Sequence, residues 1–84
     1  MRIEGDSRGL KIGIMGGTFD PIHYGHLFIA EAAHLALSLD RLIFVPAGLP
    51  PHKHYEAMAA AEDRYAMTAL AIKDNPHFEI SRIE

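Results

Sequence analysis

The sequence predicts an α/β domain built on a parallel sheet, in which strands and helices alternate in the order β-α-β-α-β. Three segments with strand-like apolar content, at 10–15, 40–45 and 77–83, are separated by segments with helical periodicity at 22–38 and 60–73. Such alternation is typical of parallel strands joined by right-handed crossovers. Parallel sheets of this kind bind ligands at the carboxyl ends of their strands.

Composition limits the classes of function. The chain has 84 residues, of which 49% are hydrophobic and 23% charged, and it contains no cysteine. Its formal net charge of -3 provides no overall basic field for nucleic acid. No apolar run approaches the roughly 20 residues of a membrane span, and residues 1–9 are too polar for a signal peptide. We therefore expect a cytoplasmic protein that binds neither nucleic acid nor membrane.

The first half of the chain begins with a polar segment. Residues 1–9 mix charge and glycine, so we expect a flexible leader there and the folded domain over 10–84. Residues 10–15 are apolar enough for a buried strand. The helix expected over 22–38 has an apolar stripe at i, i+3, i+6 and i+10, formed by Leu27, Ala30, Ala33 and Leu37.

The second half repeats the pattern. A continuous apolar run predicts a buried strand over 40–45, and Pro50-Pro51 indicates a loop over 46–54. Glu62 and Asp63 fall in the first turn of the helix expected over 60–73, where the helix dipole favours acids. The inner face of that helix is expected to be formed by Tyr65, Thr68, Ala69 and Ile72, and Asn75-Pro76 ends it before the third strand.

A glycine-rich turn with two histidines lies between the first strand and the first helix. Gly16 and Gly17 allow backbone N–H groups to approach a ligand closely, and a helix N-terminus favours an anion such as phosphate. His23 and His26, at i and i+3, can face the same ligand. They could also be surface histidines, or with Asp20 begin a zinc site, although no further ligand has zinc-site spacing. The dinucleotide pattern G-x-G-x-x-G and the Walker pattern are absent.

Two segments resemble a known family. Residues 16–27, GGTFDPIHYGHL, resemble the signature of the nucleotidyltransferases that carry the (H/T)-x-G-H motif. Residues 46–53, PAGLPPHK, resemble the P-x-x-x-P-P-H-K element of bacterial nicotinate-nucleotide adenylyltransferases, and the resemblance continues through 64–72 and 74–78. It implies a Rossmann-like nucleotidyltransferase fold, of which this chain would be the N-terminal βαβαβ half.

The resemblance also implies a reaction, in which nicotinate mononucleotide and ATP give deamido-NAD and pyrophosphate. His23 and His26 match the catalytic motif histidines, which would hold the ATP phosphates in the transition state. Mg²⁺ would be held mainly by the phosphates, without a dedicated protein metal site. Asp20 would orient the turn, approach Mg²⁺ or cap the helix. The nucleotide-binding positions would be Gly16, Gly17, Thr18, Phe19, Asp20, His23 and His26, and His52 and Lys53 would bind substrate.

Alternatives remain at this point. A related adenylyl- or cytidylyltransferase with another phosphorylated acceptor has the same first motif, and a non-catalytic nucleotide-binding module would also need it. We expect Arg64 to reach a phosphate or to pair with an acid, and His34 and His77 to be structural. Because the family chain is about twice as long, we expect a fragment that does not turn over ATP. The strand over 10–15 would have an unpaired edge and could drive self-association.

Overall fold

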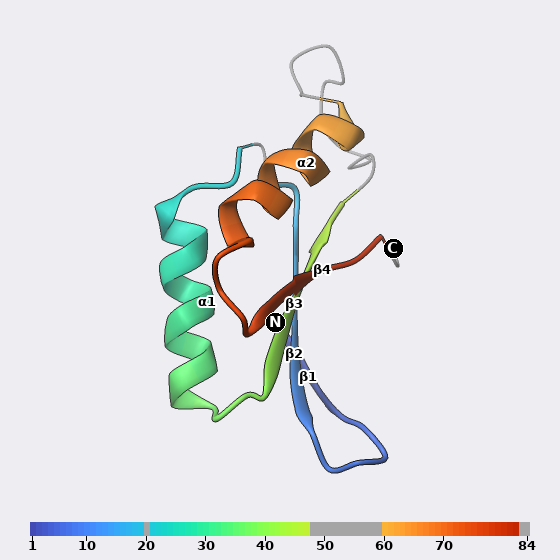
Figure 1. The fold of residues 1–84 in the computed structure, drawn as a ribbon, viewed down its shortest axis with the longest axis vertical. Coiled ribbons are helices and arrows are strands. Elements are labelled where there is room, and N and C mark those ends of the chain that lie inside the picture. Colours follow the sequence, from blue (N-terminus) through green and yellow to red (C-terminus); the bar gives the residue numbers. More distant parts are fainter. Residues whose placement is uncertain (20, 48–59, 83–84) are drawn as a thin grey trace.

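A computed structural model describes residues 1–19, 21–47 and 60–82. These residues form a four-stranded sheet in the order β1-β2-β3-β4, with two helices (Figure 1). Asp20 and residues 48–59 and 83–84 lie outside the described part of the chain, so the expected roles of Asp20, His52 and Lys53 have no structural account. The elements are β1 (Arg2–Gly5), β2 (Lys11–Gly17), α1 (Tyr24–Ala36), β3 (Arg41–Pro46), α2 (Ala61–Ile72) and β4 (Phe78–Ile80).

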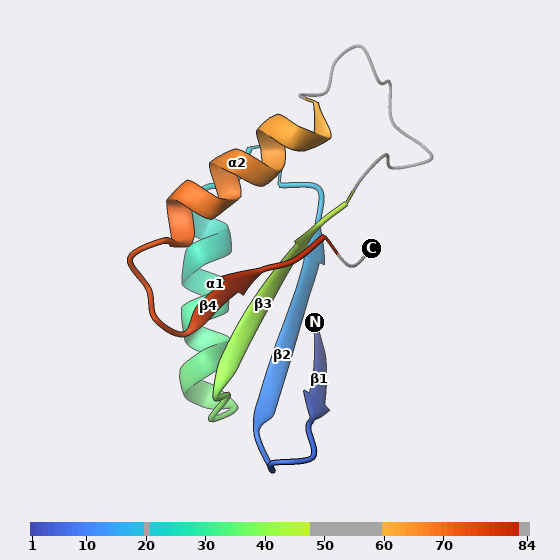
Figure 2. The same ribbon diagram turned by 45° about the vertical axis from the view of Figure 1, so that its right-hand side comes forward.

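The strands β2, β3 and β4 are parallel, which confirms the predicted α/β class. Gly13 lies opposite Leu42, and Leu42 lies opposite Phe78, so the three strands share one register across the sheet. The helices α1 and α2 connect these strands and lie on the same side of the sheet (Figures 1 and 2). The carboxyl ends of β2 and β3 therefore meet at one edge, as the alternating pattern predicts.

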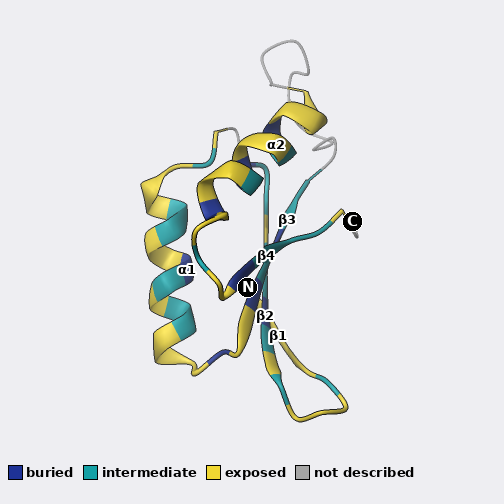
Figure 3. Cartoon of the chain, viewed as in Figure 1, coloured by how far each residue is buried: buried dark blue, intermediate teal, exposed yellow. Residues whose placement is uncertain are grey.

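The core lies between the sheet and the two helices. Leu42 and Phe44 of β3 are fully buried in it. Figure 3 shows buried segments on both the strands and the helices. Leu27, Ala30 and Ala33 of the predicted stripe pack in or against this core, but Leu37 is 38% exposed, because α1 ends at Ala36. The buried hydrophobic residues are Phe19, Ala30, Leu39, Leu42, Phe44, Ile72 and Phe78.

The N-terminal residues differ from the expectation. Arg2–Gly5 form β1, which pairs antiparallel with β2, so the predicted leader contains a regular strand. The Asp6 carboxylate supports the turn by accepting the amides of Arg8 at 2.8 Å and Leu10 at 3.0 Å. The bond from Leu10 is the main reason that the pKa of Asp6 lies below its ordinary value. Because β1 pairs with Lys11–Ile14, the prediction that this flank of the first strand lacks a partner was wrong for most of its length.

None of the described helices is both long and apolar enough to cross a membrane.

Candidate phosphate-binding site

The site is built where β2 ends. The Ala47 amide, just beyond β3, donates to the Gly17 carbonyl at 2.7 Å and holds the two strand ends together. Thr18 and Phe19 follow the end of β2, and the chain leaves the sheet toward α1 (Figure 2). The glycine turn therefore lies at the carboxyl edge of the parallel sheet, where such folds bind ligands.

His23 and His26 together cap the N-terminus of α1. The Nδ1 atom of His23 accepts the Gly25 amide at 3.0 Å, and the Nδ1 atom of His26 accepts the His23 amide at 3.0 Å. This is a reciprocal capping box in which both side chains are imidazoles. A ring nitrogen that accepts a backbone N–H carries no proton, so each neutral ring holds its proton on Nε2. The cap thus fixes both histidines as Nε2–H donors.

Gly25 makes room for this arrangement. A Cβ atom at residue 25 would lie 2.7 Å from Cε1 of His23 and 2.9 Å from its Nδ1. Real Cβ atoms do not approach other atoms so closely, and the His23 ring is held there by its bond to the Gly25 amide. The glycine in the His-x-Gly-His segment is therefore explained by the folded-back position of the first imidazole.

The electrostatics of the site favour neutral His26. Burial, followed by the nearby charge of His23, lowers the pKa of His26 below its ordinary value of 6.5. The two rings stack with their centroids 3.9 Å apart, which disfavours a charge on both. The first turn of α1 contains no acidic residue, so no side chain of that turn neutralises the positive end of the helix dipole. The site can therefore offer the uncharged Nε2–H donor of His26 to an anion.

Phe19 connects the glycine turn with His26. Its φ of 49° is in the left-handed region, which residues with a Cβ rarely adopt. Its ring is 2% exposed, meets the His26 ring edge-on at 5.0 Å, and lies 3.3 Å from where a Cβ of Gly17 would be. Gly17 therefore leaves space for the Phe19 ring, and Phe19 supports the His26 ring from the side.

Arg64 reaches the same region from α2, a position that the sequence pattern did not predict. Its side chain is fully buried, and Nη1 donates to the carbonyl oxygens of Thr18 at 2.9 Å and Ala47 at 2.6 Å. Arg64, Thr68 and Ile72 are the buried residues of α2. Their spacing of four residues was a signal in the sequence, but a charged residue is rarely assigned to an apolar face.

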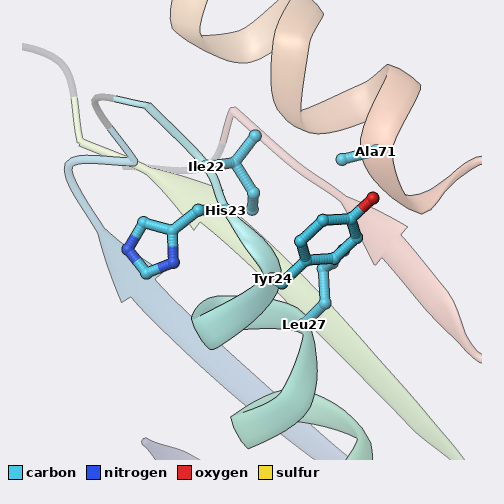
Figure 4. A pocket seen from close by; sticks show the side chains of 5 residues that line it. All are labelled: Ile22, His23, Tyr24, Leu27 and Ala71. Carbon is cyan, nitrogen blue, oxygen red and sulfur yellow. The ribbon is translucent and has the colours of Figure 1, made fainter.

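A hollow of about 440 Å³ lies between the start of α1 and α2, lined by Ile22, His23, Tyr24, Leu27 and Ala71. The His23 imidazole points away from Tyr24, Leu27 and Ala71 (Figure 4). The side chains that face this hollow are mostly apolar, unlike a site for phosphate. His23 thus borders this hollow, although its ring points away from the apolar side chains that line the rest of it.

The structure brings together most of the predicted site residues that it describes. Gly17, Phe19, His23 and His26 are linked by the contacts given above, and Gly16 and Thr18 flank Gly17 in the chain. His34 and His77 stack on each other at 4.2 Å, away from the turn, as expected for a structural pair. In the ranges 1–19, 21–47 and 60–82, no group of three or more His, Asp or Glu side chains is arranged to hold a metal ion.

Comparisons with known proteins agree with this architecture. A probable nicotinate-nucleotide adenylyltransferase of Moorella thermoacetica is 60% identical over 74 residues, which cover 88% of this chain and 34% of that protein. A protein of the same name from Thermoanaerobacter sp. is 58% identical over 77 residues, covering 92% of this chain and 36% of the relative. A third, from Roseiflexus sp., is 60% identical over 73 residues, covering 87% and 37%.

The chain thus spans roughly a third of the length of these curated relatives. The family model described as cytidylyltransferase-like matches residues 14–84, which include the glycine turn, both motif histidines and Arg64. Because this match covers most of the chain, the protein belongs to the cytidylyltransferase-like family.

Proposed function

We propose that this chain provides the nucleotide-binding part of an adenylyltransferase that joins ATP and nicotinate mononucleotide into deamido-NAD and releases pyrophosphate. One observation carries the proposal: the capping box fixes His23 and His26 side by side as Nε2–H donors next to a glycine turn. Fixed donors in that position suit the phosphates of a nucleotide. The names of the relatives support the choice of ATP and nicotinate mononucleotide.

The proposed reaction is a displacement at phosphorus. A phosphate oxygen of nicotinate mononucleotide attacks the α-phosphorus of ATP, and the bond from that phosphorus to the bridging oxygen of the leaving pyrophosphate breaks. No covalent bond to the protein forms. His23 and His26 donate hydrogen bonds to phosphate oxygens whose negative charge increases in the transition state. Gly16 and Gly17 let the backbone approach the nucleotide closely, so that the two reactants are held in line.

Magnesium fits this proposal as an ion carried by the substrate. Mg²⁺ prefers oxygen ligands and retains several waters, whereas the described side chains at the turn offer imidazole nitrogens. The phosphates of ATP would therefore supply most of the ligands of the Mg²⁺ ion, and the ion would neutralise phosphate charge. From the sequence we also propose that His52 and Lys53 bind an anionic group of the substrate, that Asp20 orients the turn, and that the protein acts in the cytoplasm.

The family description favours a second candidate, in which the nucleotide is CTP. The two candidates differ in the base, while the histidines contact phosphates in both. We expect the purified 84-residue chain to bind ATP more tightly than CTP, measured by isothermal titration with Mg²⁺ present. Tighter binding of CTP would favour the second candidate and contradict the adenylyl assignment.

A matched pair of histidine variants tests the site itself. His26→Gln keeps the reciprocal cap, because a glutamine at this position can accept the same backbone amide, but it replaces the imidazole Nε2–H donor. His34→Gln changes another histidine of α1 that lies outside the site. We expect His26→Gln to weaken ATP binding by about tenfold and His34→Gln to leave it unchanged. Equal affinities for both variants and the unmodified chain would overturn the phosphate role of His26.

A further inference from the structure

We propose that Arg64 is a positioning residue, which fixes the phosphate-binding turn and, through it, the ring of His26. The statement that the turn binds phosphate rests on the proposed function. The contacts of Arg64 with the turn do not depend on any ligand. Arg64 lies in the first half of α2, and its side chain is fully buried at the end of the sheet. Nothing in the motif of the glycine turn includes this residue, which is separated from Thr18 by 46 positions in the chain.

Arg64 bridges the residues that follow the ends of β2 and β3. One nitrogen of the guanidinium, Nη1, donates both to the Thr18 carbonyl at 2.9 Å and to the Ala47 carbonyl at 2.6 Å. Ala47 in turn donates its amide to the Gly17 carbonyl at 2.7 Å. The residues that follow β2 and β3 are therefore tied to each other and to α2 through a single cation.

Thr18 is linked to His26 through Phe19. The Thr18 carbonyl belongs to the peptide that joins Thr18 to Phe19, so its orientation affects the φ angle of Phe19. That angle, 49°, is unfavourable for a residue with a Cβ and is retained only where the surroundings enforce it. Arg64 holds one side of that peptide, and the Phe19 ring rests against His26 at 5.0 Å.

The buried side chain at residue 64 is a cation, and this choice has a physical reason. A fully buried guanidinium loses its hydration, and an apolar side chain of similar volume stabilises a fold as well or better. Stability alone is therefore a poor reason for an arginine at residue 64. A guanidinium can instead bind two carbonyl oxygens at a fixed angle, because its donors are rigid and planar. That rigidity is what a turn with an unfavourable backbone angle requires.

The experiment compares Arg64→Met with Thr68→Val in the 84-residue chain. Arg64→Met keeps apolar volume and removes the donors. Thr68→Val removes a buried hydroxyl one turn later in α2, which donates to the Arg64 carbonyl at 2.8 Å, and so perturbs the helix while leaving the guanidinium in place. The readouts are the ligand-free NMR signals of the Phe19 ring and the His26 ring, including the ¹⁵N shifts that report the imidazole tautomer, and the affinity for ATP.

We expect Arg64→Met to shift the signals of both rings and to weaken ATP binding by about tenfold. Thr68→Val should lower the melting temperature and leave the ring signals and the affinity unchanged. Arg64→Lys, which retains a buried cation with a donor, should recover part of both losses; it also replaces Arg64→Met in the comparison if the methionine variant does not fold.

Unchanged ring signals in a folded Arg64 variant, or an ATP affinity within twofold of the unmodified chain, would overturn the proposal. So would equal shifts in Thr68→Val, because they would show a general effect of disturbing α2. If the unmodified chain itself fails to bind ATP, the proposed function fails, while the ligand-free ring signals still decide whether Arg64 positions the turn.

Discussion

The two helices of this molecule begin in different ways. The N-terminus of α1 is capped by its own histidines, and its first turn contains no acidic residue. The N-terminus of α2 has Ala60 at the cap position without a side-chain bond, and Glu62 and Asp63 lie in its first turn. Both helices follow a parallel strand, so the topology alone would give both the same opportunity to bind an anion.

The difference bears on the proposal that the N-terminus of α1, rather than that of α2, accepts a phosphate. Glu62 and Asp63 already compensate the positive end of the α2 dipole, and an incoming anion would meet like charge. Glu62 is also engaged by Arg82, whose Nη1 lies 2.6 Å from its carboxylate. At α1 the cap satisfies backbone amides with imidazole rings and adds no negative charge. The proposed anion site at α1 thus depends on the side chains that cap this helix.

The largest effect is expected for His26→Ala, which removes the cap and the donor together. We expect ATP affinity to fall by about tenfold to a hundredfold, because a hydrogen bond to a charged group is lost. The free energy of unfolding should fall by about 1 kcal/mol, as is typical when a capping side chain is lost. Isothermal titration and urea unfolding measure the two quantities.

His26→Gln separates these contributions, since it should lose affinity and keep most of the stability. If His26→Gln is as unstable as His26→Ala, the side chain at this position does not act through the capping box, and the contrast between the helices is wrong.

A smaller effect is expected when α1 is made to resemble α2. Tyr24 is the first residue of α1 and is 88% exposed, so Tyr24→Glu places an acid in the first turn without removing a buried side chain. We expect ATP affinity to fall by about threefold to fivefold, since a charge near a helix end contributes up to about 1 kcal/mol. The effect should diminish at high salt. Titration at two salt concentrations measures it.

Asp63→Asn is the reciprocal control, because it removes an exposed acid from the first turn of α2. It should leave ATP affinity unchanged. A gain in affinity for Asp63→Asn equal to the loss for Tyr24→Glu would show that both helix ends act on the nucleotide alike.

The smallest expected effect is a pH dependence of the free energy of unfolding that arises from His26 in α1. Because the folded-state pKa of His26 is lowered from 6.5, mainly by burial, the unfolded chain binds a proton first as the pH falls. The contribution of His26 to stability is therefore complete above pH 6.5 and is lost as the pH falls through the folded-state pKa. Urea unfolding at pH 7.5 and pH 5 should show a smaller decrease in His26→Gln than in the unmodified chain. Identical decreases would show that His26 titrates alike in both states.

Much of the fold could be predicted from the sequence, since apolar runs and helical periodicity report burial directly. The strand through Leu42 and Phe44 and the helix through Ala30 were predicted on that basis and are confirmed. β1 was missed because it has only four residues, two of them charged, and its pairing depends on a turn around Asp6 that no periodicity reveals. A short, polar strand such as β1 forms because it pairs with the neighbouring strand β2.

The residues of the candidate site could be named from the sequence, but their arrangement could not. The spacing of His23, Gly25 and His26 indicated a phosphate site, but the sequence could not show that the rings cap their own helix. The buried position of Arg64 and the left-handed backbone of Phe19 depend on contacts between residues distant in the chain. Such contacts have no periodic signature, and they determine how the donors are held.

Because β1 pairs with β2, a flank of β2 where another strand could bind is already occupied. Any other strand that is to lie there, from a longer chain or from another molecule, must first release Arg2–Gly5 from their register with β2. The turn at Asp6–Gly9 tethers β1 beside its partner, so β1 competes at an effective concentration in about the millimolar range, as short linkers provide. A weaker incoming strand is excluded, and a stronger one would leave β1 free as an unpaired segment.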